Sequence, residues 1–371
     1  MPSKKTTILL AVLVIGILAI PAFLSARVFI DFSRKNPAQN VKEYEKELKL
    51  LKKGDAVTNQ FTKKVILRVP FGSSEETLGL GLPVEPPLDS YVAPGAMAVA
   101  RNGDIYLADP LNKAIKVYSQ QGKFLKKIPF GHDLLKDFGL DAQDNLYVLG
   151  SSRLYKKEFD QDAFQALGPA LNEAHNLEVT PQGHAIILDY TLPPNDNLRT
   201  QKLDKEGKVL QSTEQHNFDL NMFEFEDEQG RKVGFFKLGG GPAGAQYKIT
   251  RDTGSKEEVI YEGYVPEGYY YRSLEVLGFD KKGDMYFLRI ISPDIPTETP
   301  DQIAEKINKT EVWVDILDIS QEKISSVRLE PDMRLYGEFA TPHIYDVDIH
   351  GNIYQMQADT QGVVIIKYSK K

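Results

Sequence analysis

The stretch MAVARNGDIYLAD, residues 97–109, decides the fold, because its pattern returns four times further along the chain. It consists of an apolar run, a turn rich in Gly, Asp or Asn, and a second apolar run that opens on an apolar residue followed by tyrosine. Such turns between alternating apolar runs are typical of β-hairpins. The later copies are FGLDAQDNLYVLG (138–150), LEVTPQGHAIILD (177–189), LGFDKKGDMYFLR (277–289) and YDVDIHGNIYQMQ (345–357).

The tyrosine of each copy serves as a ruler for the repeat. Tyr106 and Tyr147 are 41 residues apart, and Ile186, the equivalent of the tyrosine in the third copy, follows after 39. The next 100 residues, up to Tyr286, leave room for two units, with a degenerate copy around 233–238. The final 68, up to Tyr354, hold one unit and an insertion. A period near 40 residues indicates a β-propeller, here with six blades.

The two ends of the repeat region complement each other. After the last copy the chain ends one strand short of a full blade, whereas KKVILRVPFG (63–72) echoes GKFLKKIPFG (122–131). We therefore expect residues 65–69 to complete the C-terminal blade, which closes the ring and leaves no open strand edge. The sequence predicts an all-β fold, a six-bladed β-propeller over residues 63–371 closed by an N-terminal strand.

The first blade carries a family resemblance. GDIYLADPLNKAIKVYSQQGKFL (103–125) resembles an NHL-type repeat, in which an Asp-Ile-Tyr-Leu-Ala-Asp strand precedes an asparagine turn and an Ile-x-x-Tyr strand. Residues 63–371 as a whole are similar to six-bladed NHL-repeat or TolB-like propellers, although only the first blade fits the repeat closely. The resemblance implies the fold and leaves the activity open, because such families include protein-binding scaffolds as well as metal-dependent lactonases and lyases.

The N-terminus is predicted to be a membrane anchor. After Lys4 and Lys5 no charged residue occurs over residues 6–26, a length that can cross the hydrocarbon core as a helix. A cleaved signal peptide is the alternative, but a cut after Ala22, Ser25 or Ala26 would leave a bulky residue at the −3 position. We expect one transmembrane helix in residues 1–30 and a spacer with a short helix in residues 31–62. The propeller would then belong to a single-pass membrane protein and lie outside the cytoplasm.

Composition removes several classes of function. The 371 residues carry a net charge of −7 with basic residues scattered among more acids, which argues against a nucleic-acid partner. The chain has no cysteine, and this excludes disulfides, thiolate metal ligands and cysteine nucleophiles. The HExxH and GxSxG motifs of hydrolases are also absent.

The ruler predicts which side chains line the central channel. The position eight residues before the ruler holds Ala98, Gly139, Glu178, Gly278 and Asp346, and it should face the channel because the two neighbouring positions are apolar. Imidazole and carboxylate groups are ligands for zinc and other divalent cations. His175, Glu178, His343 and Asp346 are therefore candidate metal ligands, and the alternative is that they are polar residues wetting a water-filled channel.

Long connections predict a second candidate region on the top face, where blades are joined and second strands lead to third strands. They comprise residues 72–94, 192–197, 239–244 and 292–309, the last with a short helix starting at Thr299 and Pro300. The candidate ligand-binding residues are Tyr269, Tyr270 and Tyr271, directly before the fifth inner strand, with Asp137 and Asn176.

Two functions follow from these sites. The first is a non-enzymatic binding or scaffold propeller that presents its top face to a protein or a cell-envelope ligand. The second is a metal-dependent, lactonase-like hydrolase or lyase with its site at the channel mouth and a divalent metal as cofactor. The lack of hydrolase motifs favours the first.

Overall fold

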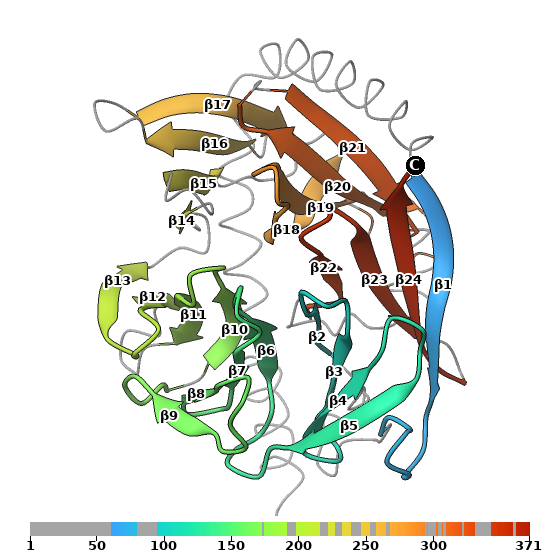
Figure 1. Cartoon of the computed structure of the whole chain (residues 1–371). Coiled ribbons are helices and arrows are strands. Elements are labelled where there is room, and N and C mark those ends of the chain that lie inside the picture. Colours follow the sequence, from blue (N-terminus) through green and yellow to red (C-terminus); the bar gives the residue numbers. More distant parts are fainter. Residues whose placement is uncertain are drawn as a thin grey trace, which may run out of the picture.

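A computed structural model gives the structure of the chain (Figure 1). The described residues form 24 strands in six four-stranded antiparallel sheets, the six blades of a propeller. The structure describes residues 61–79, 95–172, 174–190, 198–215, 222–226, 232–238, 246–252, 257–264, 268–293, 295, 302, 306, 309–320, 323–330, 343–358 and 361–371.

Each blade runs outward from an inner strand at the channel. Blades one to three comprise β2 (Met97–Val99), β3 (Ile105–Asp109), β4 (Ala114–Tyr118), β5 (Phe124–Pro129), β6 (Asp137–Leu140), β7 (Leu146–Leu149), β8 (Leu154–Lys157), β9 (Gln165–Leu167), β10 (Ala174–Val179), β11 (Ala185–Tyr190), β12 (Leu198–Leu203) and β13 (Val209–Gln215). Blades four to six comprise β14 (Met222–Glu226), β15 (Lys232–Leu238), β16 (Gln246–Asp252), β17 (Glu257–Tyr264), β18 (Tyr269–Phe279), β19 (Met285–Pro293), β20 (Glu311–Asp318), β21 (Lys323–Leu329), β22 (Tyr345–Val347), β23 (Ile353–Ala358), β24 (Gly362–Lys370) and β1 (Phe61–Pro70).

The predicted closure of the ring is confirmed. β1 pairs with β24 in antiparallel register from Phe61 opposite Lys370 to Pro70 opposite Gly362, with a bulge between Val65 and Leu67. The closing strand begins two residues before the predicted boundary at residue 63. Its buried side chains join a hydrophobic cluster that extends over blades five, six and one. The last blade therefore has its full four strands with the edge of β24 covered, and the first and last strands of the described chain hold the ring together (Figure 1).

Strand register confirms the tyrosine ruler. The ruler residue pairs with the residue eight positions before it in all five copies, namely Tyr106 with Ala98, Tyr147 with Gly139, Ile186 with Glu178, Tyr286 with Gly278 and Tyr354 with Asp346. The degenerate fourth copy predicted around residues 233–238 is β15, the second strand of blade four.

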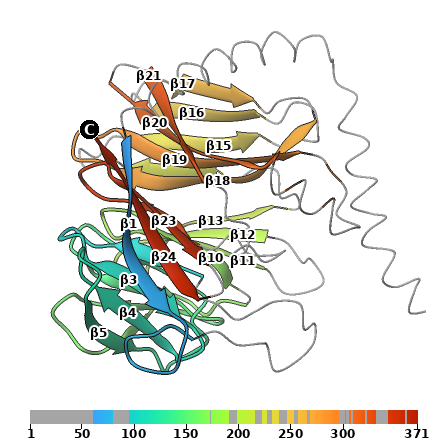
Figure 2. The same ribbon diagram turned by 90° about the vertical axis from the view of Figure 1, so that its right-hand side faces the viewer.

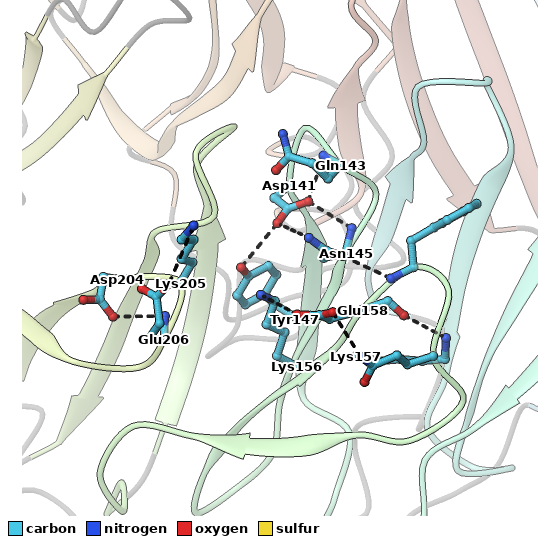
Figure 3. Close-up of polar contacts among 12 residues, drawn as sticks. Asp141, Gln143, Asn145, Tyr147, Lys156, Lys157, Glu158, Asp204, Lys205 and Glu206 are labelled. Carbon is cyan, nitrogen blue, oxygen red and sulfur yellow. Dashed lines mark hydrogen bonds and ion pairs between the residues drawn. The ribbon is translucent and has the colours of Figure 1, made fainter.

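A buried aspartate explains why tyrosine recurs at this position. In blade two the Asp141 carboxylate accepts hydrogen bonds from the backbone of Gln143 and Asn145, both at 2.9 Å, and from the Tyr147 hydroxyl at 3.3 Å (Figure 3). The Asp280–Tyr286 and Asp348–Tyr354 pairs repeat the arrangement at 3.1 and 2.9 Å. Blade one has Ala100 and blade three has Thr180 at the position of this aspartate. The tyrosine thus fastens the hairpin turn to the strand that follows it.

These turns also connect neighbouring blades. A Cβ atom at Gly183 of blade three would lie 2.7 Å from the Tyr147 hydroxyl of blade two, so only glycine fits there. Gly183 has a φ of 81°, which favours glycine as well. We call the face that carries these turns the bottom and the face of the blade-to-blade connections the top. In Figure 2 the strands are seen from the side, between the two faces.

Several predicted elements lie outside the described residues. They include the anchor in residues 1–30 and the spacer up to residue 60. Within the part of the chain that the structure describes, no helix has the length and apolar character needed to cross a membrane. The predicted insertion helix is described only at Gln302, Lys306 and Lys309, which are helical. The loops over residues 80–94, 192–197 and 239–244 also lie outside.

The start of the first top loop is fixed to blade one. The buried Lys116 ammonium lies 2.8 Å from the Asp109 carboxylate and donates hydrogen bonds to the backbone carbonyls of Ser74 and Thr77. Asp109 in turn accepts a hydrogen bond from the backbone of Gly79 at 3.0 Å. An ion pair inside the NHL-like repeat therefore holds the segment that follows the closing strand.

Candidate functional site: the central channel

The inner strands surround a cavity of about 170 Å³. Its lining comes from β2, β6, β10, β18 and β22 and from several of the bottom turns that follow them. All five residues predicted to face the channel line this cavity: Ala98, Gly139, Glu178, Gly278 and Asp346. The ruler alignment therefore identified the lining position. It did not identify the bottom turns, whose residues 100–101, 141–142 and 348–349 also contribute.

The lining residues differ from the prediction in their direction. A Cβ atom at Gly139 would lie 2.7 Å from the Val179 side chain of the next blade. Asp346 likewise reaches the next blade, where it accepts a 2.6 Å hydrogen bond from the backbone of Val99. The inner strands converge on the axis, so a side chain that leaves one strand meets the following blade as well as the channel. Side chains at this position join blades in addition to lining the cavity.

His343 and Asp137 meet at the upper end of the channel. His343 Nδ1 lies 3.0 Å from Asp137 Oδ1, and both side chains are largely buried. Asp137 also accepts hydrogen bonds from the backbone of Phe138 at 2.8 Å and of Leu177 at 2.9 Å. The histidine carbonyl accepts a hydrogen bond from the backbone of Met97 at 2.7 Å. His343, a predicted metal ligand, and Asp137, a predicted ligand-binding residue, thus form one polar link between blades six, one, two and three.

The pair fixes the charge on His343. Burial lowers its pKa, but the charge of Asp137 and the hydrogen bond to it, followed by the charges of Glu275 and Glu178, raise the pKa of His343 to about 10. The imidazole is therefore protonated at neutral pH. Because Nδ1 faces Asp137, only the other ring nitrogen could act on a substrate or bind a metal ion, and it would first have to lose its proton.

Glu178 is the least satisfied polar group of the site. Its Oε2 atom is buried and has no hydrogen-bond partner among the described residues. Burial raises the pKa of Glu178 to about 8; the charge of His343 opposes this shift, and the charges of Glu275 and Asp137 add to it. At neutral pH the carboxyl group is therefore mostly protonated.

Asp346 is less available for proton transfer or metal binding than a free carboxylate would be. Burial raises its pKa to about 7, although hydrogen bonds from the backbone of Val99 and Val347 oppose the shift. One carboxylate oxygen accepts the 2.6 Å bond from Val99 and the other a 2.7 Å bond from Val347. The bond from Val99 holds β22 against β2, and the bond from Val347 stays within β22.

Glu275 belongs to the same site and was not predicted. It lines the cavity and influences the pKa values of His343 and Glu178. A bulge between Val276 and Gly278 places Glu275 opposite the second residue after the ruler, the register that Asp137 and Asn176 occupy in blades two and three. A search of the fifth copy for acids near the ruler, allowing for one extra residue, would have found it.

The metal site remains a prediction. His175 lies on β10, but its side chain is outside the description, so its distance from His343 is not tested. Among the side chains that the structure describes, no group of three or more metal-ligating residues is close enough to hold an ion. Asn176 is half-buried on the same strand.

The tyrosine triplet lies inside a strand, not ahead of one. Tyr269 is the first residue of β18 and packs against the core of blades four and five. Tyr270 is half-buried, with the Lys306 ammonium 5.1 Å from its ring centre. The Tyr271 side chain is outside the description. The predicted position of the three tyrosines ahead of the strand was wrong, because β18 extends further toward the top than the repeat pattern indicates, and their role in ligand binding stays a prediction.

The described strands define a six-bladed β-propeller, consistent with the NHL-repeat or TolB-like type. No protein-family model matches the chain, and no curated protein matches it. Its fold is similar to a virginiamycin B lyase from Staphylococcus aureus, at 12% identity and a TM-score of 0.43 over 83% of this chain and 99% of that one. It is also similar to a member of the DUF4221 family from Bacteroides vulgatus, at 12% and 0.47 over 84% and 99%. A gluconolactonase from Xanthomonas campestris gives 11% and 0.41 over 74% and 85%. At such identities no activity of these proteins is transferred to this chain.

Proposed function

We propose that this chain is a membrane-anchored binding or scaffold propeller outside the cytoplasm, which presents its top face to a protein or a cell-envelope ligand. The uncharged stretch over residues 6–26 supports the anchor. One observation carries the binding function over catalysis: Asp137, Asp346 and His343 of the channel are engaged in hydrogen bonds between blades.

A catalytic set needs groups that are free to exchange protons or to hold a reacting atom. Asp137 accepts from two backbone N–H groups and contacts His343, which is held protonated. Asp346 has one backbone partner on each oxygen. These groups stabilise the ring, which supports a rigid scaffold whose function lies on its surface.

The top face supplies exposed apolar side chains that suit a binding surface. Leu111, in the connection between β3 and β4, is 48% exposed, and Leu134, in the connection between β5 and β6, is 56% exposed. Apolar contacts of this kind form the centre of many protein interfaces. The chain reaches β1 at Phe61, at the bottom end of that strand, so a tether from the membrane leaves the top free.

Photocrosslinking in the native cells tests this function. A photoreactive amino acid replaces Leu111 or Leu134 in the full-length chain, with Phe159 as the matched bottom-face position, 55% exposed. We expect the same discrete crosslinked partner from both top positions and none from position 159. Equal crosslinking from position 159, or none from either leucine, would contradict the proposed top-face function.

A metal-dependent hydrolase or lyase is the second candidate. The buried Glu178 oxygen without a described hydrogen-bond partner favours it, with His175, His343 and Asp346 as the other candidate ligands. Metal analysis of the purified full-length chain tests this candidate, with Glu178→Gln as the variant. One bound ion per chain that the variant loses would support it over the scaffold.

A further inference from the structure

Exposed lysines gather at the bottom of blades five, six and one. Two lie near the start of β1, one in the turn between β4 and β5, two in the turn between β18 and β19, and one directly after β24. We call this set the basic sector; it consists of Lys63, Lys64, Lys123, Lys281, Lys282 and Lys371. The chain as a whole has a net charge of −7, so this surface has the opposite sign to the protein that carries it.

The elements that carry these lysines are in contact. Phe61 pairs with Lys370, which places the start of β1 beside the end of β24. The Lys370 ammonium lies 3.5 Å from the Asp280 carboxylate in the turn of blade five. In the same turn, the backbone of Lys281 donates a 2.8 Å hydrogen bond to Ile349 of blade six. A Cβ atom at Gly122 of blade one would lie 3.1 Å from the Ile66 carbonyl of β1. The basic sector is therefore one continuous surface.

Two of the acids in this region are withdrawn from solvent. Asp280 is 3% exposed and Asp348 is 6% exposed, and both accept hydrogen bonds from their own turns. Glu330 offsets part of the Lys63 charge through an ion pair. On the other side of the ring, the bottom turn of blade two exposes Glu158, Asp160 and Asp162, whereas in blade three Glu206 is accompanied by the exposed Lys205 and Lys208. The bottom face is thus basic around blades five, six and one and acidic at blade two.

We propose that the basic sector binds anionic lipid headgroups of the membrane that carries the anchor. This inference rests on the proposed membrane anchoring. Phe61, where the predicted spacer meets the propeller, lies inside the sector, so the tether delivers this part of the ring to the lipid surface first. Each lysine close to an anionic membrane raises the partitioning of the protein onto that membrane by about fivefold. Salt weakens this attraction. The acidic side of the bottom face is repelled, so the ring tilts onto blades five, six and one.

The test uses the full-length chain and exploits its lack of cysteine. A fluorophore is attached to Gln121→Cys beside the basic sector or to Gln161→Cys on the acidic side, both exposed positions. Vesicles contain phosphatidylcholine alone or mixed with phosphatidylglycerol, and a fraction of headgroups carries a quencher. We expect stronger quenching at position 121 than at 161 in the anionic vesicles only, and we expect high salt to remove the difference.

Charge reversal provides the matched pair of variants. Lys281→Glu with Lys282→Glu changes a bottom turn inside the basic sector, whereas Lys205→Glu with Lys208→Glu changes exposed lysines in a bottom turn of blade three. The first pair should lower the anionic preference more than about tenfold and the second should leave it unchanged. Equal quenching at positions 121 and 161, or no effect of the first pair, would overturn the proposal.

Two further outcomes separate the proposals. Flotation with pure phosphatidylcholine vesicles reports the anchor alone. If the chain does not float there, the anchoring proposal fails, and salt-sensitive flotation with phosphatidylglycerol still decides whether the basic sector binds lipid. Salt-sensitive self-association without vesicles, lost in Lys281→Glu with Lys282→Glu, would assign the sector to the acidic turns of a second copy and overturn the lipid proposal.

Discussion

His343 Nδ1 lies 3.0 Å from Asp137 Oδ1, although the two residues are 206 positions apart and belong to blades six and two. The contact passes the inner strand of blade one, which is hydrogen-bonded to the His343 backbone through Met97. One ion pair thus connects blades on either side of the ring closure. The following predictions concern this pair, its acidic neighbour and the elements that close the ring.

Asp137→Asn should destabilise the propeller by about 3 kcal/mol, because breaking a buried ion pair leaves the partner charge without compensation. The asparagine amide also cannot replace every acceptor that the carboxylate offers to Phe138 and Leu177. Urea denaturation at neutral pH measures the loss. Asp160→Asn, at an exposed turn position, is the control and should change stability by less than about 0.5 kcal/mol. Equal stability of the two variants would show that the His343 pair contributes little.

Glu178→Gln should stabilise the protein at alkaline pH. The folded-state pKa of Glu178 is raised from 4.5 to about 8. Its contribution to stability is therefore fully present below pH 4.5 and is lost as the pH rises through about 8. Glutamine stays neutral, so the difference in Tm between variant and wild type should grow in favour of the variant across this window. Thermal unfolding followed by circular dichroism tests it.

The control for the Glu178 experiment is Glu206→Gln, at a side chain that is 66% exposed. Its Tm should follow that of the wild type at every pH. The pKa values of Asp346 and His343 are also raised, to about 7 and about 10, and their contributions decline with rising pH in the same direction. A wild-type Tm that increases steadily between neutral pH and about pH 9 would contradict the pKa shifts.

Gly362→Ala should weaken the closure of the ring. A Cβ atom at Gly362 would collide with the Val69 carbonyl of β1, and backbone atoms cannot move aside as a flexible side chain can. We expect a loss of about 2 kcal/mol or more and a raised tendency to aggregate, because a displaced β1 exposes the edge of β24. Gly131→Ala is the matched control, since a Cβ atom there meets nothing within 4 Å. Urea denaturation and light scattering compare the two; a G362A variant as stable and soluble as G131A would count against closure by β1.

Tyr147→Phe should cost about 1 kcal/mol, because it leaves one acceptor of the buried Asp141 without its hydroxyl donor. Tyr354→Phe should cost at least as much, since its hydrogen bond to Asp348 is shorter. Tyr106→Phe serves as the control, because Ala100 takes the place of the aspartate in blade one. Chemical denaturation of the three variants decides the matter. If Tyr106→Phe is as destabilising as Tyr147→Phe, the hydroxyl bond to aspartate is not the reason for the ruler tyrosine.

The sequence was sufficient to predict the six blades and the closure, because both depend on patterns of residues that are close together in the chain. Hairpin turns and alternating apolar residues determine which residues pair within a blade, and the echo between residues 63–72 and 122–131 identifies the displaced strand. The ruler also identified the inner-strand position that lines the channel, as the pairing of Tyr354 with Asp346 shows.

The partners within the channel could not be predicted in the same way. The ruler gives the height of a residue on its blade but not the direction in which it leans, so the Asp137–His343 pair across blade one was not foreseen. Glu275 was missed because the bulge beside Gly278 shifts it by one position, and a bulge leaves no trace in the spacing of apolar residues. Raised pKa values likewise depend on burial, which sequence position does not measure.

The position of Phe61 opposite Lys370 determines how the ring responds to mechanical load. A pull on the chain ahead of Phe61 is borne by the β1–β24 ladder, which runs from this pair to Pro70 and Gly362. The closing strand is therefore the element of the described ring that such a load reaches first, and blade six is the blade that takes the load.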